Sequence, residues 1–273
     1  MSDTLRLTDR TALLRHRDRA ARDPALFLHE AVRDEAQDRL QMVNRSFTDA
    51  AIVTPFPQVW DGFAPGARIV PDAPVLDLVE GAHDLVIHAM ALHWADDPVG
   101  QLIQCRRALR PDGLLLAFTP GGRTLTELRA ALGQAEVEVT GGLSPRVAPM
   151  AEIRDLGALL QRTGLALPVA DAWTLTVEYG SALNLMRDLR AMGETNALDG
   201  RLRRFTRRSV LLRAAELYAQ GFATPQGRVP ATFEIIALTG WAPDASQPQP
   251  LRPGSAAARL ADALNTHETP LGD

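Results

Sequence analysis

The stretch DLVIHAMALHWADDPVGQLIQCRRALRPDGLLLAFTPGGRTLTELR, residues 84–129, decides the fold of this chain. Its first five residues are almost all apolar, which is typical of a strand that is buried on both faces. Residues 96–109 are expected to form a helix, and a Pro-Asp-Gly turn at 111–113 leads into a second apolar strand over 114–119. Strand, helix and strand in this order make one β-α-β step of a parallel sheet. The stretch therefore predicts an α/β fold.

The rest of the chain extends this pattern in both directions. An N-terminal helical segment is expected over residues 1–48, and an α/β domain over 49–241. Inside that domain, auxiliary helices are expected at about 124–163 and 181–220. Five prolines between residues 54 and 74 leave no room there for a long helix. The Pro- and Ala-rich tail, residues 242–273, is expected to be partly disordered.

Composition excludes several classes of function. The chain has 273 residues, and its 29 basic residues are all arginine, with no lysine. Without lysine there is no Schiff-base enzyme and no phosphate-binding GxxxxGK[ST] loop. The single cysteine, Cys105, excludes a disulfide framework and a thiolate zinc cluster. A net charge of −4 gives no reason to expect nucleic-acid binding, and no apolar run approaches the ~20 residues of a membrane span.

The first residues of the chain bear on its location. The sequence MSDTLRLTDRTALLRHRDRAARDP is rich in arginine, but aspartates are interleaved with the arginines. A mitochondrial transit peptide is poor in acidic residues, so a solvated helix is the better interpretation. No secretory signal is seen, and a cytoplasmic location is predicted.

Several sequence blocks lie in an order that resembles a known family. DLVIHAMALHW, RRALRPDG and LLLAF resemble the type-11 group of class I S-adenosylmethionine (SAM) methyltransferases. A closer resemblance is to the family of the mitochondrial complex I assembly factor, which is described as a protein-arginine hydroxylase with a methyltransferase fold. The blocks that carry it are GGRTLTELR, GGLSPRVAPM, RDLGALLQRTG, LMRDLRAMGETNA and VPATFEIIALTGW, which run to residue 241.

The resemblance implies a Rossmann-like class I methyltransferase sandwich, here shortened in its first half and preceded by N-terminal helices. It implies SAM as cofactor, and an arginine in the quinone-site iron–sulfur subunit of complex I as substrate. The chain departs from the family at the first strand, residues 50–53. There the expected glycine-rich loop is replaced by Thr54-Pro55-Phe56-Pro57. Because glycines let the backbone approach the cofactor and prolines lack an N–H, this replacement predicts weak or absent SAM binding.

Part of the expected cofactor site is retained. Asp72 and Ala73 match the acidic loop that, in the superfamily, accepts a hydrogen bond from the adenine amino group; a turn aspartate between two prolines is the alternative interpretation of Asp72. His88 and Ala89 end the strand at 84–88, where the superfamily contacts the methionine end of the cofactor. The carboxyl ends of parallel strands are where such sheets bind ligands.

Three residues are candidates for catalysis. His93 and Trp94 follow the same strand on a loop, where a histidine can act as a general base and a tryptophan can stack on a ligand. Arg123 follows two glycines near the end of the next strand and is able to bind a carboxylate or phosphate. The alternatives are a packed aromatic pair and a surface arginine. The histidines show no metal-ligand spacing, so no metal site is predicted.

Two functions follow from these observations. The first is a SAM-dependent methyltransferase or related hydroxylase. The second is a non-catalytic scaffold or assembly chaperone, a pseudoenzyme that binds a protein partner through the retained family blocks. Arg146 and Arg187 are candidate contacts for that partner, since arginine is enriched at interface hot spots. The run of Arg201, Arg203, Arg204, Arg207 and Arg208 is either a solvated face or a dock for an acidic patch.

Overall fold

Strand β3 (His83–Ala89) lies inside a six-stranded sheet and is buried along its whole length. The computed structural model describes residues 6–248 and 260–266. The other strands of the sheet in this part of the chain are β1 (Ala50–Val53), β2 (Arg68–Val70), β4 (Leu109–Pro120), β5 (Ala166–Tyr179) and β6 (Val229–Trp241). Their order across the sheet is β2-β1-β3-β4-β6-β5. The first four strands of this order are parallel, while β6 is antiparallel to both β4 and β5.

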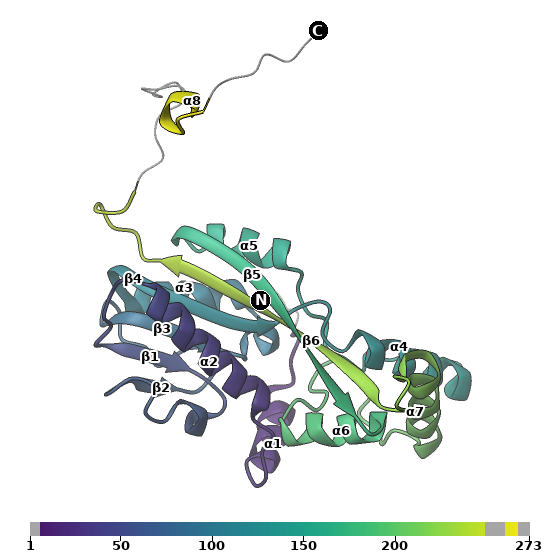
Figure 1. Cartoon of the computed structure of the whole chain (residues 1–273). Coiled ribbons are helices and arrows are strands. Elements are labelled where there is room, and N and C mark those ends of the chain that lie inside the picture. Colours follow the sequence, from purple (N-terminus) through teal and green to yellow (C-terminus); the bar gives the residue numbers. More distant parts are fainter. Residues whose placement is uncertain (1–5, 249–259, 267–273) are drawn as a thin grey trace. The chain divides into compact units, whose positions relative to one another are not determined.

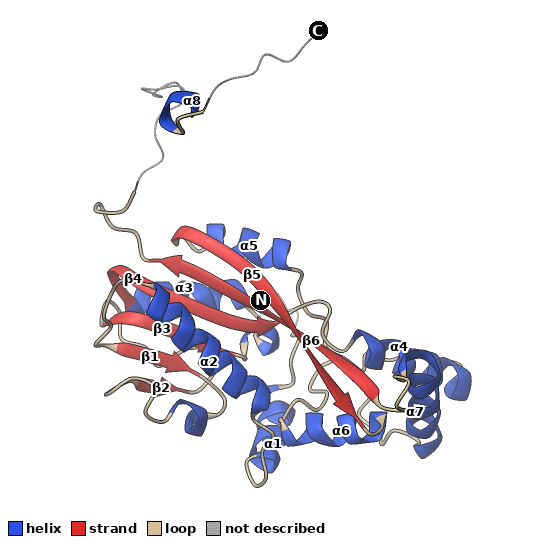
Figure 2. Cartoon of the chain, viewed as in Figure 1, coloured by secondary structure: helices blue, strands red, loops and turns tan. Residues whose placement is uncertain are grey.

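Helices cover both faces of the sheet, as Figures 1 and 2 show. One face packs against α2 (Phe27–Met42), α4 (Thr126–Thr140), α6 (Ala182–Ala191) and α7 (Arg208–Phe222), and the other against α3 (Pro98–Ala108) and α5 (Ile153–Arg162). Successive strand residues alternate between the two cores, so Ile87 faces the first and Val86 the second. This arrangement confirms the predicted Rossmann-like α/β sandwich.

The antiparallel pair of β5 and β6 is longer than the other strands and extends beyond the body of the sheet, and the segment between these two strands contains α6 and α7. The far end of the pair lies among α4, α6 and α7 (Figure 1). These helices form a wall around the space beyond the carboxyl ends of β3 and β4. Of the helices expected at about 124–163 and 181–220, α4, α6 and α7 therefore enclose the candidate site described below, whereas α5 lies on the other face of the sheet.

The second parallel strand begins earlier than the sequence predicts. The Pro-Asp-Gly sequence at residues 111–113 lies inside β4 instead of preceding it. Leu109 pairs with His83, and pairing then resumes between Leu114 and Leu85, so the residues between them form a bulge. Asp112 accommodates the bulge with a positive φ of 58°, a conformation that aspartate tolerates better than most residues. The turn chemistry was correct, but the sheet continues across it.

The proline-rich passage after β1 contains two short elements that the sequence analysis missed. A 3-10 helix, η1 (Pro57–Trp60), follows the end of β1, and β2 (Arg68–Val70) pairs in parallel with β1. Both are only three or four residues long, which is too short to leave a periodic signal in the sequence. Phe56 and Trp60 are 2 % exposed, so this passage packs into the core.

Helix α1 (Arg10–Ala20) packs on the loops at the carboxyl end of the sheet. Asp9 caps it by accepting a hydrogen bond from the backbone N–H of Ala12. Leu13 is fully buried in a small apolar cluster that also contains Trp94, Ala148 and Leu198. Helix α1 thus joins segments that are far apart in the sequence.

Residues 1–243 form one compact unit, and residues 244–273 form a second. The described part of the second unit contains the short helix α8 (Leu260–Ala263). Most of the tail predicted to be partly disordered lies outside the described residues, and the boundaries at 48/49 and 241/242 stay predictions. Within residues 6–248 and 260–266, no helix has both the length and the apolar character needed to span a membrane.

Candidate functional site

A cavity of about 250 Å³ opens beyond the carboxyl ends of β3 and β4, enclosed by α2, α4, α6 and α7. Most of its wall is apolar. That part of the wall includes Leu28, Met90, Leu125, Leu128, Leu132, Met150, Met186, Leu189, Met192, Leu211, Phe233 and Ile235. Methionine side chains adapt to different ligand shapes, so a wall with four of them suits a flexible apolar group. We call this space the apolar cavity.

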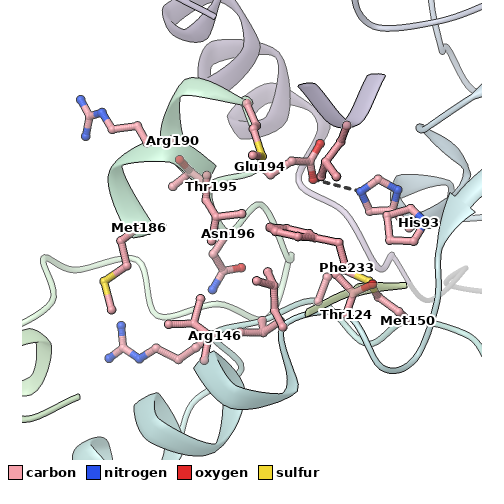
Figure 3. A pocket seen from close by; sticks show the side chains of 18 of the residues that line it. His93, Thr124, Arg146, Met150, Met186, Arg190, Glu194, Thr195, Asn196 and Phe233 are labelled. Carbon is pink, nitrogen blue, oxygen red and sulfur yellow. Dashed lines mark hydrogen bonds and ion pairs between the residues drawn. The ribbon is translucent and has the colours of Figure 1, made fainter. Parts of the chain in front are cut away.

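One carboxylate interrupts the apolar wall. Glu194 lies just after α6, and its Oε2 accepts hydrogen bonds from His93 Nε2 (2.9 Å) and Trp94 Nε1 (2.7 Å). Both donors lie on a 3-10 turn, η2 (Leu92–Trp94), directly after β3. Figure 3 shows the Glu194–His93 contact on one side of the cavity, with Arg146 and Met186 on the other.

Glu194 remains ionised in this position. Burial opposes the charge, but His93, Arg17 and Trp94 outweigh burial and lower the pKa of Glu194 to about 2. Both anchoring bonds go to Oε2, and among the described residues no hydrogen bond to Oε1 is seen. The side chain is 21 % exposed and lines the cavity. The site therefore offers a negatively charged acceptor in a mostly apolar wall that also includes Arg146 and Arg190.

A second histidine lines the same cavity without a charge. His29, on α2, packs edge-on against Phe56 with ring centroids 4.8 Å apart. Burial lowers its pKa to about 4, although Glu194 acts in the opposite direction. At neutral pH, His29 is a neutral ring, so Glu194 keeps its net negative charge toward the cavity.

Arg17 on α1 lies between Asp72 and Glu194 and acts on both carboxylates. Its Nη1 donates to Asp72 Oδ1 at 2.6 Å, and its positive charge also acts on Glu194. Arg10 Nη1 donates to the other carboxylate oxygen, Asp72 Oδ2, at 3.0 Å. Arg10 Nη2 donates to the backbone carbonyl of Asp72. Both oxygens of the Asp72 carboxylate are thus occupied by arginines of the chain itself.

The loop after β1 has few hydrogen-bond donors to offer. Pro55 and Pro57 have no N–H, the N–H of Thr54 donates to the carbonyl of Val70, and that of Phe56 donates to Thr54 Oγ1. The side chain of Phe56 is buried. No backbone N–H from residue 54 to residue 57 is therefore available to a ligand.

The structure places the predicted cofactor residues in two surroundings. Asp72 and Ala73 line a small pocket of about 100 Å³. His88 is fully buried, with Nε2 3.3 Å from Gln101 Oε1, and Gln101 in turn donates to the carbonyl of Ala73 at 2.6 Å. Ala89 is fully buried in the core. These residues are neighbours through Gln101, but His88 and Ala89 do not line the small pocket.

The predicted catalytic residues are only partly brought together. His93 and Trp94 both line the apolar cavity, and Trp94 also lines the small pocket. Arg123 does not line either space; its side chain is 67 % exposed, with Nε 3.9 Å from Glu234 Oε1. Among the described residues, no group of three or more His, Cys, Asp or Glu is placed to hold a metal ion.

Sequence reasoning missed the carboxylate at the centre of the site. The sequence analysis assigned no role to Glu194, although it lies in the family block LMRDLRAMGETNA just after α6. Arg17 was interpreted as part of a solvated helix, yet its side chain is only 7 % exposed. An acidic residue inside a family block was the signal that could have identified Glu194. No sequence signal distinguished Arg17 from the exposed arginines around it.

The candidate partner contacts also differ in their surroundings. Arg146 lines the cavity, but its guanidinium binds Glu136 (2.5 Å) and Thr206 Oγ1 (2.7 Å). The bond from Arg146 is the largest cause that lowers the pKa of Glu136 to about 2. Arg187 is exposed on α6. Arg146 is therefore committed to a structural contact, whereas Arg187 is accessible.

Trp94→Phe is expected to lower the free energy of unfolding by about 1.5–3 kcal/mol, because it removes one hydrogen bond to the charged Glu194 but preserves most of the ring packing. Trp94 is 2 % exposed, so its replacement by alanine would also open a core cavity. The loss of packing could then not be separated from the loss of the hydrogen bond. Urea denaturation measures the change. No loss of stability in Trp94→Phe would mean that the Nε1 contact contributes nothing.

Comparisons with known proteins show that the chain is similar to methyltransferase-domain proteins over part of its length. The model of the family described as "methyltransferase domain" matches residues 61–117. The chain is 37 % identical over 198 residues to "arginine-hydroxylase NDUFAF5, mitochondrial" from Danio rerio, covering 72 % of this chain and 61 % of that protein. It is 35 % identical over 184 residues to a malonyl-[acyl-carrier protein] O-methyltransferase from Methylovorus sp. strain MP688, covering 67 % and 60 %.

Among solved structures, the YcgJ protein from Bacillus subtilis matches with a TM-score of 0.50 and 9 % identity, covering 78 % of this chain and 100 % of that one. At this identity the match supports the fold alone. The chain spans about three fifths of the length of the two curated relatives.

The predicted cytoplasmic location is wrong, because the arginine-hydroxylase relatives are named mitochondrial. That prediction rested on the aspartates among the first residues. In the structure one of these aspartates, Asp9, caps α1 and pairs with Arg201 at 2.8 Å. An aspartate at this place is thus explained by the fold and gives no information on location.

Proposed function

We propose that this chain binds an arginine side chain of a protein partner in the apolar cavity, as a complex I assembly factor like the relatives it resembles, and that it does not depend on SAM. The observation that carries the proposal is the carboxylate of Glu194, with Oε2 anchored and Oε1 free of hydrogen bonds in the described part of the chain. A guanidinium is the side-chain group that best fits a carboxylate.

The walls of the cavity suit the rest of an arginine side chain. Its three methylene groups are apolar and gain from contact with Met186, Leu189 and Phe233. The charged end would meet Glu194, whose ionised form is stabilised by His93 and Trp94. In this role His93 and Trp94 position the carboxylate rather than take part in proton transfer.

The proposal that SAM is not required rests on the loop after β1 and on Asp72. A glycine-rich loop contributes backbone N–H groups, and residues 54–57 have none to contribute. The carboxylate of Asp72, the expected partner of the adenine amino group, is held by Arg10 and Arg17. The residues present do not fit the cofactor, so we derive no reaction step through it.

A SAM-dependent enzyme is the second candidate function. The observation that favours it is the small pocket beside Asp72 and Ala73, in a region that the methyltransferase-domain model matches. The two candidates make opposite predictions for cofactor binding.

Isothermal titration of SAM into the protein is expected to give no saturable heat, because the donors and the free carboxylate that would hold the cofactor are missing. A methyltransferase that retains its glycine-rich loop serves as positive control. Saturable binding with micromolar or tighter affinity would establish the second candidate instead.

Arginine binding is tested with a fluorescein-labelled peptide that carries one central arginine, compared with the same peptide carrying citrulline, a neutral residue of nearly the same shape. The arginine peptide is expected to bind more tightly, and Glu194→Gln is expected to weaken it by 2–5 kcal/mol, or at least about thirtyfold, as for a buried charge pair that loses one partner. Glu80→Gln, which changes an exposed glutamate, is the control. Equal binding of both peptides would refute this function.

A further inference from the structure

A basic and aromatic segment lies next to the apolar cavity. Its sequence is RLRRFTRR, residues 201–208, with five arginines in a chain whose net charge is −4. Phe205 is fully exposed to solvent (101 %), and Leu202 is 39 % exposed. A fully exposed aromatic ring among like charges is unfavourable for an isolated surface and is typical of an interaction site.

The arginines of this segment divide into two groups. Arg201 and Arg203 hold the loop in place, because Arg201 pairs with Asp9 at 2.8 Å and Arg203 with Asp199 at 3.0 Å. Arg204, Arg207 and Arg208 are exposed, and the described residues provide no ion pair for any of them. We call these three arginines, together with Leu202 and Phe205, the basic rim.

Two of the rim arginines lie at the N-terminus of α7, which increases the positive potential around them. Arg207 is the N-cap of α7 and Arg208 its first residue, and no side chain caps this helix end. A helix N-terminus carries a partial positive charge, so two further positive charges there repel it. A negatively charged partner would relieve this repulsion, which makes the rim more favourable for acidic groups than its formal charge suggests.

The basic rim is continuous with the cavity. Thr206, between Phe205 and Arg207, accepts a hydrogen bond from Arg146, which lines the cavity, at a distance of 2.7 Å. Leu211, one turn into α7, lines the cavity as well. A polypeptide whose side chain entered the cavity would therefore pass close to the rim.

We propose that the basic rim is the docking surface for an acidic segment of the protein partner, with carboxylates on Arg204, Arg207 and Arg208 and an apolar side chain on Phe205. The inference rests on the proposed function, because it places the acidic segment beside the residue that enters the cavity. A polypeptide is favoured over a lipid surface because the rim borders a cavity of side-chain size.

The test uses three fluorescein-labelled peptides and two matched variants. The reference peptide has a central arginine flanked by leucine and glutamates; the second replaces the glutamates by glutamines, and the third replaces the arginine by citrulline. The rim variant reverses charge at Arg204, Arg207 and Arg208, each to Glu. The control variant makes the same change at Arg22, Arg154 and Arg162, which are exposed and belong to other elements. Circular dichroism confirms that both variants fold.

The rim variant is expected to bind the reference peptide at least about tenfold more weakly than the control variant, since each exposed pair contributes ~0.2–1 kcal/mol and reversal adds repulsion. The difference in affinity between the rim variant and the control variant should become smaller with added salt, and it should disappear when the glutamine peptide is used. Phe205→Ser should weaken the binding of all three peptides by the same factor, because each of them carries the leucine.

Equal binding of the reference peptide by the rim and control variants would overturn the inference. A second result would also overturn it. If the wild-type protein binds anionic phosphatidylserine vesicles but not the glutamate peptide, and the rim variant loses the vesicle binding, then the rim serves a lipid surface. If the citrulline peptide binds as well as the arginine peptide and rim reversal still weakens both, the docking surface stands while the proposed function fails.

Discussion

Arg17→Met is expected to lower the free energy of unfolding by about 3 kcal/mol, the scale of removing one partner from a buried ion pair. Arg17 and Asp72 have side-chain exposures of only 7 % and 8 %. The substitution leaves the buried carboxylate with Arg10, whose side chain is 26 % exposed, as its single remaining charged partner. Guanidinium denaturation at pH 7 measures the loss as a shift of the midpoint at constant slope.

The control is Arg15→Met, which changes an exposed arginine of the same helix and should alter stability by no more than about 0.5 kcal/mol. The double variant Arg17→Met, Asp72→Leu should lose less stability than the sum of the single variants, because each single variant leaves a charge without its partner. Additive losses would show that the two residues do not act as a pair. The outcome decides whether the Arg17–Asp72 pair stabilises the contact between α1 and the loop that carries Asp72.

Stability is expected to fall as the pH is lowered from about 6.5 to about 4, and His29 is expected to contribute about 3 kcal/mol of this loss. Burial lowers the pKa of His29 from 6.5 to about 4 in the folded state. In the unfolded chain the ring takes up a proton near pH 6.5, while the folded state excludes the proton until about pH 4. The stabilisation is therefore complete above pH 6.5 and is lost as the pH falls through this window.

The variant His29→Leu should flatten the pH dependence within that window, as measured by urea denaturation at a series of pH values. Part of the slope should remain, because burial also lowers the pKa of His88 and of His16. A separate loss of stability should appear in both the wild-type protein and His29→Leu between about pH 4.5 and about pH 2, where Glu194 and Glu136 take up protons. An unchanged slope between pH 6.5 and 4 in His29→Leu would show that this histidine titrates normally.

The order of the main strands and helices could be predicted because each leaves a periodic signal in a short window. The apolar run of β3 and the proline and glycine positions around α3 fixed the β-α-β step within a few residues. By contrast, β2 and η1 depend on contacts with β1 and the core, and are too short to be periodic. The turn at residues 111–113 was also found, but pairing with β3 carried β4 through it.

For the candidate site, the sequence by itself predicted that candidate residues lie directly after β3, since His93 and Trp94 follow a mostly apolar strand. It also determined that the loop after β1 lacks glycines and that two of its residues, Pro55 and Pro57, have no N–H. Only the tertiary structure decided what these residues contact. Glu194 lies about a hundred residues after His93, and Arg17 lies 55 residues before Asp72. Charge pairing across such separations is set by how helices pack on the sheet, and no local pattern encodes it.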